Sequence, residues 1–258
     1  MKIAFIGAGR MAEALIAKLK GDQIIASDID PERLSYLKRK YKIKTTKSNL
    51  DAFEHAETVI LAIKPQHMAE ALESLKTRKL GKKKKLVISI AAGIPLKYIE
   101  HKLPGNECLR AMPNNACLIG EGITALTSGN RVANKIFKTV GEVVEIQEEY
   151  FDVVTGLSGS GPAYVYRFIR ALVNAGIVNG LKEEIARKLA LQTVLGSAKT
   201  AKESKMDLEK LCEMVASPGG TTIEGLKVLD ELGLEEMMSK AVQKASEKSK
   251  VLSEKWAI

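Results

Sequence analysis

The sequence predicts an α/β protein in which a doubly wound parallel sheet comes first and an all-helical domain follows. Short apolar runs of strand length alternate with helical patterns up to about residue 148. A glycine-rich turn comes directly after the first of these runs. Beyond Glu148 the strand pattern disappears and only helical periodicity remains. We therefore expect a sheet domain over residues 1–148 and a helical domain over residues 149–258.

Length and composition predict a two-domain protein of the cytoplasm. The chain has 258 residues, of which 45% are hydrophobic, enough for a large core and two domains. Its three cysteines, Cys108, Cys117 and Cys212, are scattered and form no C-x-x-C pair, so we expect neither disulfides nor a metal site. No apolar run is long enough to cross a bilayer, and a strand begins directly after Met1-Lys2, so we expect no signal peptide and no membrane partner.

The net charge of +9 does not by itself indicate nucleic acid binding. The basic residues are spread over the helical patterns, and only 82–85 form a run, which we expect to be a solvated loop. Aromatic residues make up 5% of the chain and do not alternate with the basic ones, as a stacking surface for bases requires. We therefore expect no nucleic acid partner.

The first strand and the turn after it predict a Rossmann-type dinucleotide site. Lys2–Ile6 reads as a buried strand, and the next residues are Gly7-Ala8-Gly9-Arg10-Met11-Ala12, which open a helix. Gly7 allows the tight turn, and Gly9 lets the backbone approach a pyrophosphate at the positive end of the helix. Ala12 stands where a third glycine usually falls and still permits close helix–strand packing.

The second strand supports the same site and bears on the choice of cofactor. Gln23–Ser27 reads as a strand, and Asp28 at its end is placed to accept hydrogen bonds from ribose hydroxyls. The expected cofactor is NADH or NADPH. A carboxylate at Asp28 repels a 2′-phosphate and favours NADH, whereas Arg10 and Arg33 are near enough in sequence to offset this.

The next elements continue the alternation. Asp30-Pro31 opens a helix toward Arg39, and Asn49–His55 forms a short helical segment. Three further buried strands are expected at 58–63, 86–90 and 107–111. Two edge strands, 123–126 and 143–146, are expected to flank a helix over 132–139.

The loops that follow the three inner strands are candidates for the nicotinamide end of the site, because ligands of open parallel sheets lie beyond the carboxyl ends of the strands. The alternative is that these loops are simple turns. The full set of expected cofactor-binding residues is Gly7, Ala8, Gly9, Arg10, Met11, Asp28, Ala62, Lys64, Pro65, Ala91, Ala92, Gly93, Pro113 and Asn114.

The helical domain opens with a glycine-rich segment, Gly156–Pro162. Its glycines and serines are expected to free backbone N–H groups for an anionic group, with Ser160 and Gly161 as substrate-binding residues; an ordinary loop is the alternative. The helix that follows, 163–179, ends at Gly180 and is apolar around most of its circumference. Such a helix is expected to be buried, either in a core or against another subunit.

A second polar segment, Ser217–Thr222, precedes a later helix. Thr221 and Glu224 fit a capping box, in which the threonine caps the helix. This leaves the Thr222 hydroxyl and the amides of Gly219 and Gly220 to hold a carboxylate at the positive helix end.

These segments together resemble Δ1-pyrroline-5-carboxylate reductase over nearly the whole chain. The segments that carry the resemblance are Gly7–Ala12, Ala62–Gln66, Ser89–Gly93, Arg110–Asn114, Gly156–Val165, Leu189–Thr193 and Ser217–Gly225. Two positions depart from the family pattern: Asn115-Ala116 replaces the usual Thr-Pro, and Lys182 stands where proline is common.

The resemblance implies reduction of the cyclic imine 1-pyrroline-5-carboxylate to L-proline by NADH or NADPH, the last step of proline biosynthesis. It also implies a homodimer, or a higher oligomer, built on the C-terminal helices. In this reading Gly219, Gly220 and Thr221 join Ser160 and Gly161 in binding the substrate, and Thr222 is the catalytic residue beside the imine. The alternatives are a β-hydroxyacid dehydrogenase-type oxidoreductase and a non-catalytic NAD(P)-binding regulator.

Overall fold

A computed structural model describes residues 1–75 and 84–256 of the chain. Lys82 and Lys83 of the basic run therefore lie outside the described residues. The described chain forms two compact units, one of Met1–Ser160 with Val242–Ile258 and one of Gly161–Ala241. The last strand ends at Glu145, so the strand pattern does stop before residue 148. Whether the functional domains divide at that residue stays a prediction.

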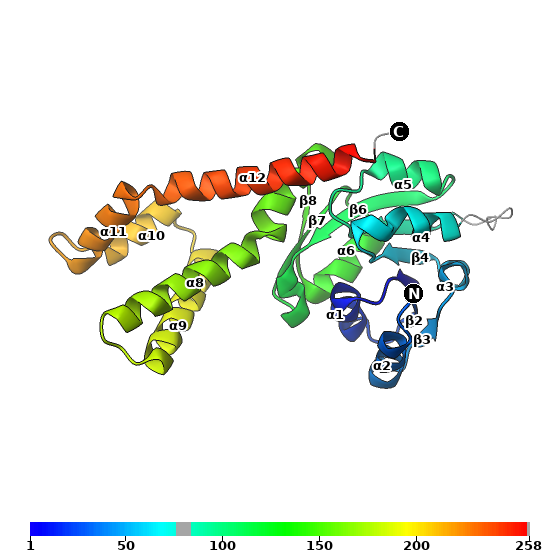
Figure 1. Ribbon diagram of the computed structural model, residues 1–258, viewed down its shortest axis with the longest axis horizontal. Coiled ribbons are helices and arrows are strands. Elements are labelled where there is room, and N and C mark those ends of the chain that lie inside the picture. The colour runs from blue at the N-terminus through cyan, green and yellow to red at the C-terminus, as the bar shows by residue number, and fades with distance from the viewer. Residues whose placement is uncertain (76–83, 257–258) are drawn as a thin grey trace. The chain divides into compact units, whose positions relative to one another are not determined.

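The first unit is built on an eight-stranded sheet with the strand order β3-β2-β1-β4-β5-β6-β7-β8 (Figure 1). Strands β1 to β6 are parallel, β7 is antiparallel to β6, and β8 is parallel to β7. The bounds are β1 Lys2–Ile6, β2 Gln23–Ser27, β3 Lys44–Thr46, β4 Thr58–Leu61, β5 Leu86–Ser89, β6 Glu107–Pro113, β7 Gly122–Leu126 and β8 Gly141–Glu145. The predicted α/β class with a doubly wound sheet is confirmed.

Helices cover both faces of this sheet. Alternate residues of β1 point to opposite faces, so Phe5 joins one hydrophobic cluster and Ile6 joins the other. The first cluster contains residues of α1, α2 and α6, and the second contains residues of α3, α4 and α5. The bounds are α1 Arg10–Lys18, α2 Pro31–Tyr41, α3 Asn49–His55, α4 Met68–Ser74, α5 Leu96–Lys102 and α6 Arg131–Phe137.

Two details of the sheet differ from the sequence prediction. Strand β3 was not predicted, because its three residues are too few to show an alternating pattern. The segment 123–126 was expected at an edge, but β8 lies outside β7, so that β7 is an inner strand. Thr124 shows the consequence, since it is only 1% exposed.

The glycine-rich segment after the sheet is helical over Thr155–Gly159, so neither the expected free amides of this stretch nor the alternative of an ordinary loop is what the structure shows. Helix α7 (Phe151–Val154) runs into a π-helical turn, η5 (Thr155–Gly159). The Ser160 N–H donates to the Thr155 carbonyl oxygen at 2.8 Å, which closes this turn. A Cβ on Gly156 would lie 2.4 Å from Ser246 Oγ of helix α12 (Leu234–Glu254), so the glycine permits close helix packing.

The second unit is helical throughout its described secondary structure. It contains α8 Gly161–Val178, α9 Glu183–Glu203, α10 Leu208–Val215 and α11 Thr221–Glu231, together with the first residues of α12. Gly180 ends α8 as predicted, with φ +94° and the Leu181 N–H donating to the Gly176 carbonyl oxygen.

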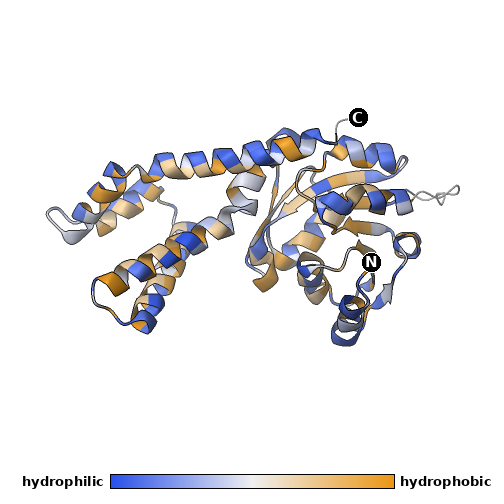
Figure 2. Ribbon diagram, in the orientation of Figure 1, coloured by the Kyte–Doolittle hydropathy of each residue, from blue (hydrophilic) through white to orange (hydrophobic). Residues whose placement is uncertain are grey.

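Helix α8 has no buried residue, although it is rich in apolar side chains (Figure 2). Val165, Phe168 and Leu172 are all more than one-third exposed. Of the two places expected for this helix, the core of its own chain is therefore excluded.

Candidate active site

Five loops of the first unit meet at one edge of the sheet, because β1, β2, β4, β5 and β6 run parallel and end there. All fourteen residues expected to bind a cofactor lie in these loops, at the ends of these strands or in the first turn of α1. The fold thus brings together residues that are up to about a hundred positions apart in the sequence.

The glycine turn between β1 and α1 has the backbone that was predicted. Gly7 has φ +95°, and a Cβ there would lie 2.5 Å from the carbonyl oxygen of Ala62. Since that contact is with backbone, no side chain can move to relieve it. Gly9 is the N-cap of α1, is exposed, and has no atom within 4 Å of a hypothetical Cβ. The space above Gly9 is therefore open for a ligand at the helix end.

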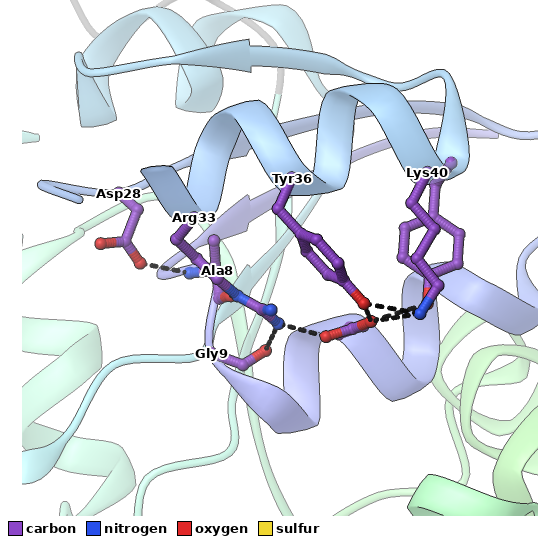
Figure 3. Close-up of polar contacts among 8 residues, drawn as sticks. Ala8, Gly9, Asp28, Arg33, Tyr36 and Lys40 are labelled. Atoms are coloured by element: carbon purple, nitrogen blue, oxygen red, sulfur yellow. Dashed lines mark hydrogen bonds and ion pairs between the residues drawn. The ribbon is translucent and has the colours of Figure 1, made fainter. Parts of the chain in front are cut away.

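The residue between these glycines is held on both sides by charged groups, Asp28 of the β2–α2 connection and Arg33 of α2. Asp28 Oδ2 accepts a hydrogen bond from the Ala8 N–H at 2.7 Å, and Oδ1 accepts from the Asp30 N–H at 3.0 Å. Arg33 Nε donates to the Ala8 carbonyl oxygen at 2.6 Å, and Nη2 donates to the Gly9 carbonyl oxygen at 3.3 Å (Figure 3). Arg33 was expected, with Arg10, to be near enough to offset the charge of Asp28; in the structure its Nε and Nη2 are bound to the turn.

Glu13 of α1 is the counter-ion of that arginine. Its Oε2 lies 2.5 Å from Arg33 Nη2, and its Oε1 accepts from Tyr36, Lys40 and Tyr41. Burial raises the pKa of the Glu13 carboxyl, but the four donors outweigh this and bring the pKa down from 4.5 to about 2. The carboxylate is therefore charged at neutral pH.

Two cations stand exposed beside the glycine turn and the β4 loop. Arg10 is the first residue of α1, and Lys64 precedes the short helix η1 (Pro65–His67). Neither side chain has a hydrogen bond or ion pair with another residue that the structure describes. Together with the positive end of α1, they make this edge suitable for phosphate groups. Met11, in the first turn of α1, is partly buried against the core cluster on that face.

The remaining loops contribute backbone. Ala91 is buried, its N–H donating to Ser89 Oγ, and Ala92 is partly exposed. Gly93 has φ +68° and packs against Leu252 of α12, so its missing side chain serves helix packing. Pro113 ends β6, and Asn114 Oδ1 accepts from the Ile123 N–H at 3.3 Å.

The π-helical turn η5 lies beside the end of β6. A Cβ on Gly159 would be 2.5 Å from Met112 Cε, which places the end of this turn next to the Pro113 loop. Ser160 follows the turn, is partly buried, and its hydroxyl has no hydrogen bond to another described residue. The Ser160 N–H is not available to a ligand, because it donates to the Thr155 carbonyl oxygen. Gly161, next in sequence, begins α8 in the second unit.

The Ser217–Thr222 segment belongs to the second unit, and its local structure corrects two predictions. The Gly220 N–H donates to the Ser217 carbonyl oxygen at 2.8 Å, and Gly219 has φ +68°. This is a turn with proline and then glycine in the middle, and the sequence Ser-Pro-Gly-Gly could have revealed it. The Gly220 amide is therefore not free.

The predicted capping box is also wrong. The N-cap of α11 is Gly220, there is no side-chain cap, and Thr221 and Thr222 are the first two helical residues. Glu224 instead bonds to Lys227 Nζ at 2.7 Å. Neither threonine hydroxyl has a hydrogen bond within the described chain. The sequence argument assigned Thr221 to the helix cap and left Thr222 for the substrate, and without a cap that distinction no longer holds.

Comparisons with known proteins cover the whole chain. Residues 148–252 match the family model described as pyrroline-5-carboxylate reductase dimerisation, and residues 2–93 match the one described as NADP oxidoreductase coenzyme F420-dependent. Two pyrroline-5-carboxylate reductases, from a Synechocystis species and from Methanosarcina acetivorans, are each 40% identical to this chain. The first match covers 99% of both chains and the second covers 98% of both. The chain belongs to the pyrroline-5-carboxylate reductase family.

Solved reductase structures agree with this fold. The Coxiella burnetii enzyme has a TM-score of 0.90 at 34% identity, and the Plasmodium falciparum enzyme, solved with NADP bound, has 0.85 at 32%. Each comparison covers 98% of both chains. The predicted family and two-part fold are confirmed, and the family match over 148–252 shows that the chain carries a self-association domain.

The described residues contain no group of three or more histidine, cysteine or acidic side chains that could hold a metal ion. In the part of the chain that the structure describes, no helix is both long and apolar enough to cross a membrane.

Proposed function

We propose that this chain reduces 1-pyrroline-5-carboxylate to L-proline, with NADH or NADPH as hydride donor. The observation that carries the proposal is membership of the reductase family over the full length, together with an open glycine turn at the carboxyl edge of the sheet. When bound, NADH or NADPH would supply a hydride to the carbon of the protonated C=N bond, and the electron pair of that bond would move to nitrogen. The iminium proton is already in place, so no strong protein acid is required.

The cofactor is proposed to bind along the loop edge of the first unit. The pyrophosphate lies over Gly9 and the N–H groups that open α1, where Arg10 adds positive charge. The adenine ribose lies beside Asp28, and the nicotinamide lies toward Lys64 and the Ala91–Gly93 and Pro113–Asn114 loops. Two backbone N–H groups hold the Asp28 carboxylate in place, and its negative charge repels a 2′-phosphate. We therefore expect a preference for NADH.

The substrate carboxylate is proposed to bind at the start of α11, with Ser160 and Gly161 as further binding residues. The first N–H groups of a helix have no partner within it, so the amides of Thr221 and Thr222 can replace that of Gly220 as donors. Gly219 and Gly220 shape the turn that exposes them. The Thr222 hydroxyl is proposed to bond the imine nitrogen, because nitrogen and carboxylate are attached to one carbon.

A homodimer, or a higher oligomer, is proposed from the exposed apolar helices of the second unit. Phe168 of α8 is 46% exposed, and Leu189 and Leu195 of α9 are 55% and 62% exposed. Large apolar side chains that stand this exposed on neighbouring helices are typical of a protein interface, and the matched dimerisation domain indicates a second copy as the partner. The three cysteines are free thiols, which suits the reducing cytoplasm.

One assay separates this function from its alternatives. Nicotinamide absorbance is followed with the pyrroline carboxylate, with β-hydroxy acids, and with no substrate. Turnover with the imine alone is expected. Turnover with hydroxy acids only would favour the dehydrogenase, and cofactor binding without turnover would favour the regulator.

A further inference from the structure

The contacts of Arg33 concern the geometry of the glycine turn itself. Its Nε donates to the Ala8 carbonyl oxygen at 2.6 Å, which is the shorter of its two bonds to the turn. In a trans peptide the C=O and the following N–H point in opposite directions. Fixing the Ala8 carbonyl toward Arg33 therefore directs the Gly9 N–H away from Arg33. The space at Gly9 is open, since a Cβ there would meet nothing within 4 Å.

The other side of Ala8 is fixed as well. Its N–H donates to Asp28 Oδ2 at 2.7 Å, so both peptide groups of this residue are held by side chains, one from the β2–α2 connection and one from α2 (Figure 3). A glycine-rich turn has many accessible backbone conformations, and the ordering of such a turn on binding costs free energy. A turn that is already held in place avoids that cost.

Glu13 keeps the arginine in this position. The carboxylate contacts Arg33 Nη2 from α1, and the arginine side chain is 24% exposed. Lys40 and the Tyr36 and Tyr41 hydroxyls hold the carboxylate from α2. Because Nε and Nη2 of Arg33 are bonded to the turn and to Glu13, only Nη1 is left, and a bidentate grip on a phosphate would break one of these bonds.

We propose that Arg33 is a positioning residue for the cofactor pyrophosphate, held in place by Glu13, and not a ligand of the 2′-phosphate of NADPH. This inference rests on the proposed binding of NADH or NADPH at this edge. It predicts that Arg33 acts equally on the two cofactors, because both carry the same pyrophosphate.

The experiment compares Arg33→Met with Lys40→Met in the full-length protein. Each substitution keeps an unbranched apolar stem and removes one cationic partner of Glu13, but only Arg33 touches the turn. Dissociation constants for NADH and NADPH are measured by fluorescence without substrate, alongside the melting temperature and the kcat with saturating cofactor.

Arg33→Met is expected to weaken both cofactors by about tenfold and by the same factor, with kcat unchanged. Lys40→Met is expected to leave both dissociation constants unchanged. Arg33→Lys keeps the ion pair with Glu13 but cannot grip two carbonyl groups, so it is expected to weaken both cofactors as well.

Two outcomes overturn the inference. One is a loss confined to NADPH, which makes Arg33 a phosphate ligand; the other is wild-type affinity in both Arg33 variants. Failure of the proposed function is a separate result, because it appears as absence of imine turnover in the unsubstituted protein.

Discussion

Gly7 and Gly9 stand two residues apart, and the structure predicts opposite consequences for replacing them with alanine. At Gly7 the new Cβ meets the Ala62 carbonyl oxygen at 2.5 Å, and the backbone has φ +95°. Left-handed backbone costs a non-glycine residue about 1–2 kcal/mol, and overpacking against fixed atoms costs about 1–3 kcal/mol more. Gly7→Ala should therefore destabilise the protein by about 2–5 kcal/mol, or roughly 4–20 °C in melting temperature.

At Gly9 the same substitution meets nothing within 4 Å, and the backbone has φ −67°. Alanine is a poorer N-cap than glycine, which costs up to about 1 kcal/mol, but it also restricts the unfolded chain by about 0.4–1 kcal/mol. These effects nearly cancel, so stability should stay close to that of the wild type. The new methyl group instead occupies the space proposed for the pyrophosphate, and the KM for NADH should rise by at least about tenfold.

Thermal unfolding and NADH kinetics on the two variants decide the matter. If Gly9→Ala binds NADH like the wild type, the pyrophosphate does not pass over Gly9 and that placement is refuted. If Gly7→Ala melts at the wild-type temperature, the predicted strain at Gly7 is refuted. A Gly9→Ala variant that loses only stability would show that the open space is not a binding site.

Three further results are expected. Thr222→Val should lower kcat/KM for the imine by about 10- to 150-fold with NADH affinity unchanged, whereas Thr221→Val should leave the melting temperature unchanged, since it caps nothing. Asp28→Asn should raise the ratio of kcat/KM with NADPH to that with NADH by about tenfold or more, measured with both cofactors. Glu13→Gln should lower the unfolding free energy at pH 7 by about 1–2 kcal/mol. The pKa of Glu13 in the folded protein is about 2, below its usual 4.5, so this stabilisation is present above pH 4.5 and is lost as the pH falls toward 2. In urea unfolding, the difference in stability between Glu13→Gln and the wild type should therefore shrink in that pH range.

The first half of the site could be predicted from sequence because its determinants are local. The run from Lys2 to Asp28 contains a buried strand, a glycine turn, an amphipathic helix and a second strand, and each has a short-range pattern. Parallel pairing then fixes where the loops meet, since the carboxyl ends of all parallel strands share one edge. The prediction of Gly7 as the tight turn and of the strands around it is confirmed.

What could not be predicted depends on contacts between distant side chains or on backbone detail. Arg33 and Glu13 are 20 residues apart, and nothing in either local sequence indicates that they pair. Nothing in the single sequence distinguishes a π-helical turn at Thr155–Gly159 from a loop, because glycine and serine suit both. The capping box at Thr221 failed for a different reason: the motif fits, but the preceding Ser-Pro-Gly-Gly turn makes Gly220 the cap.

Asp28 has one observed contact, with the glycine turn, and one proposed contact, with the ribose. Its carboxylate was predicted from sequence as a ribose ligand, and in the structure it also holds the Ala8 N–H at 2.7 Å. A change at Asp28 can therefore act through the ribose or through the shape of the glycine turn. Loss of the turn weakens NADH and NADPH alike, whereas loss of the charge favours only the cofactor with the 2′-phosphate. The ratio of the two cofactors thus reports the charge, and their common change in affinity reports the turn that Arg33 holds from the other side.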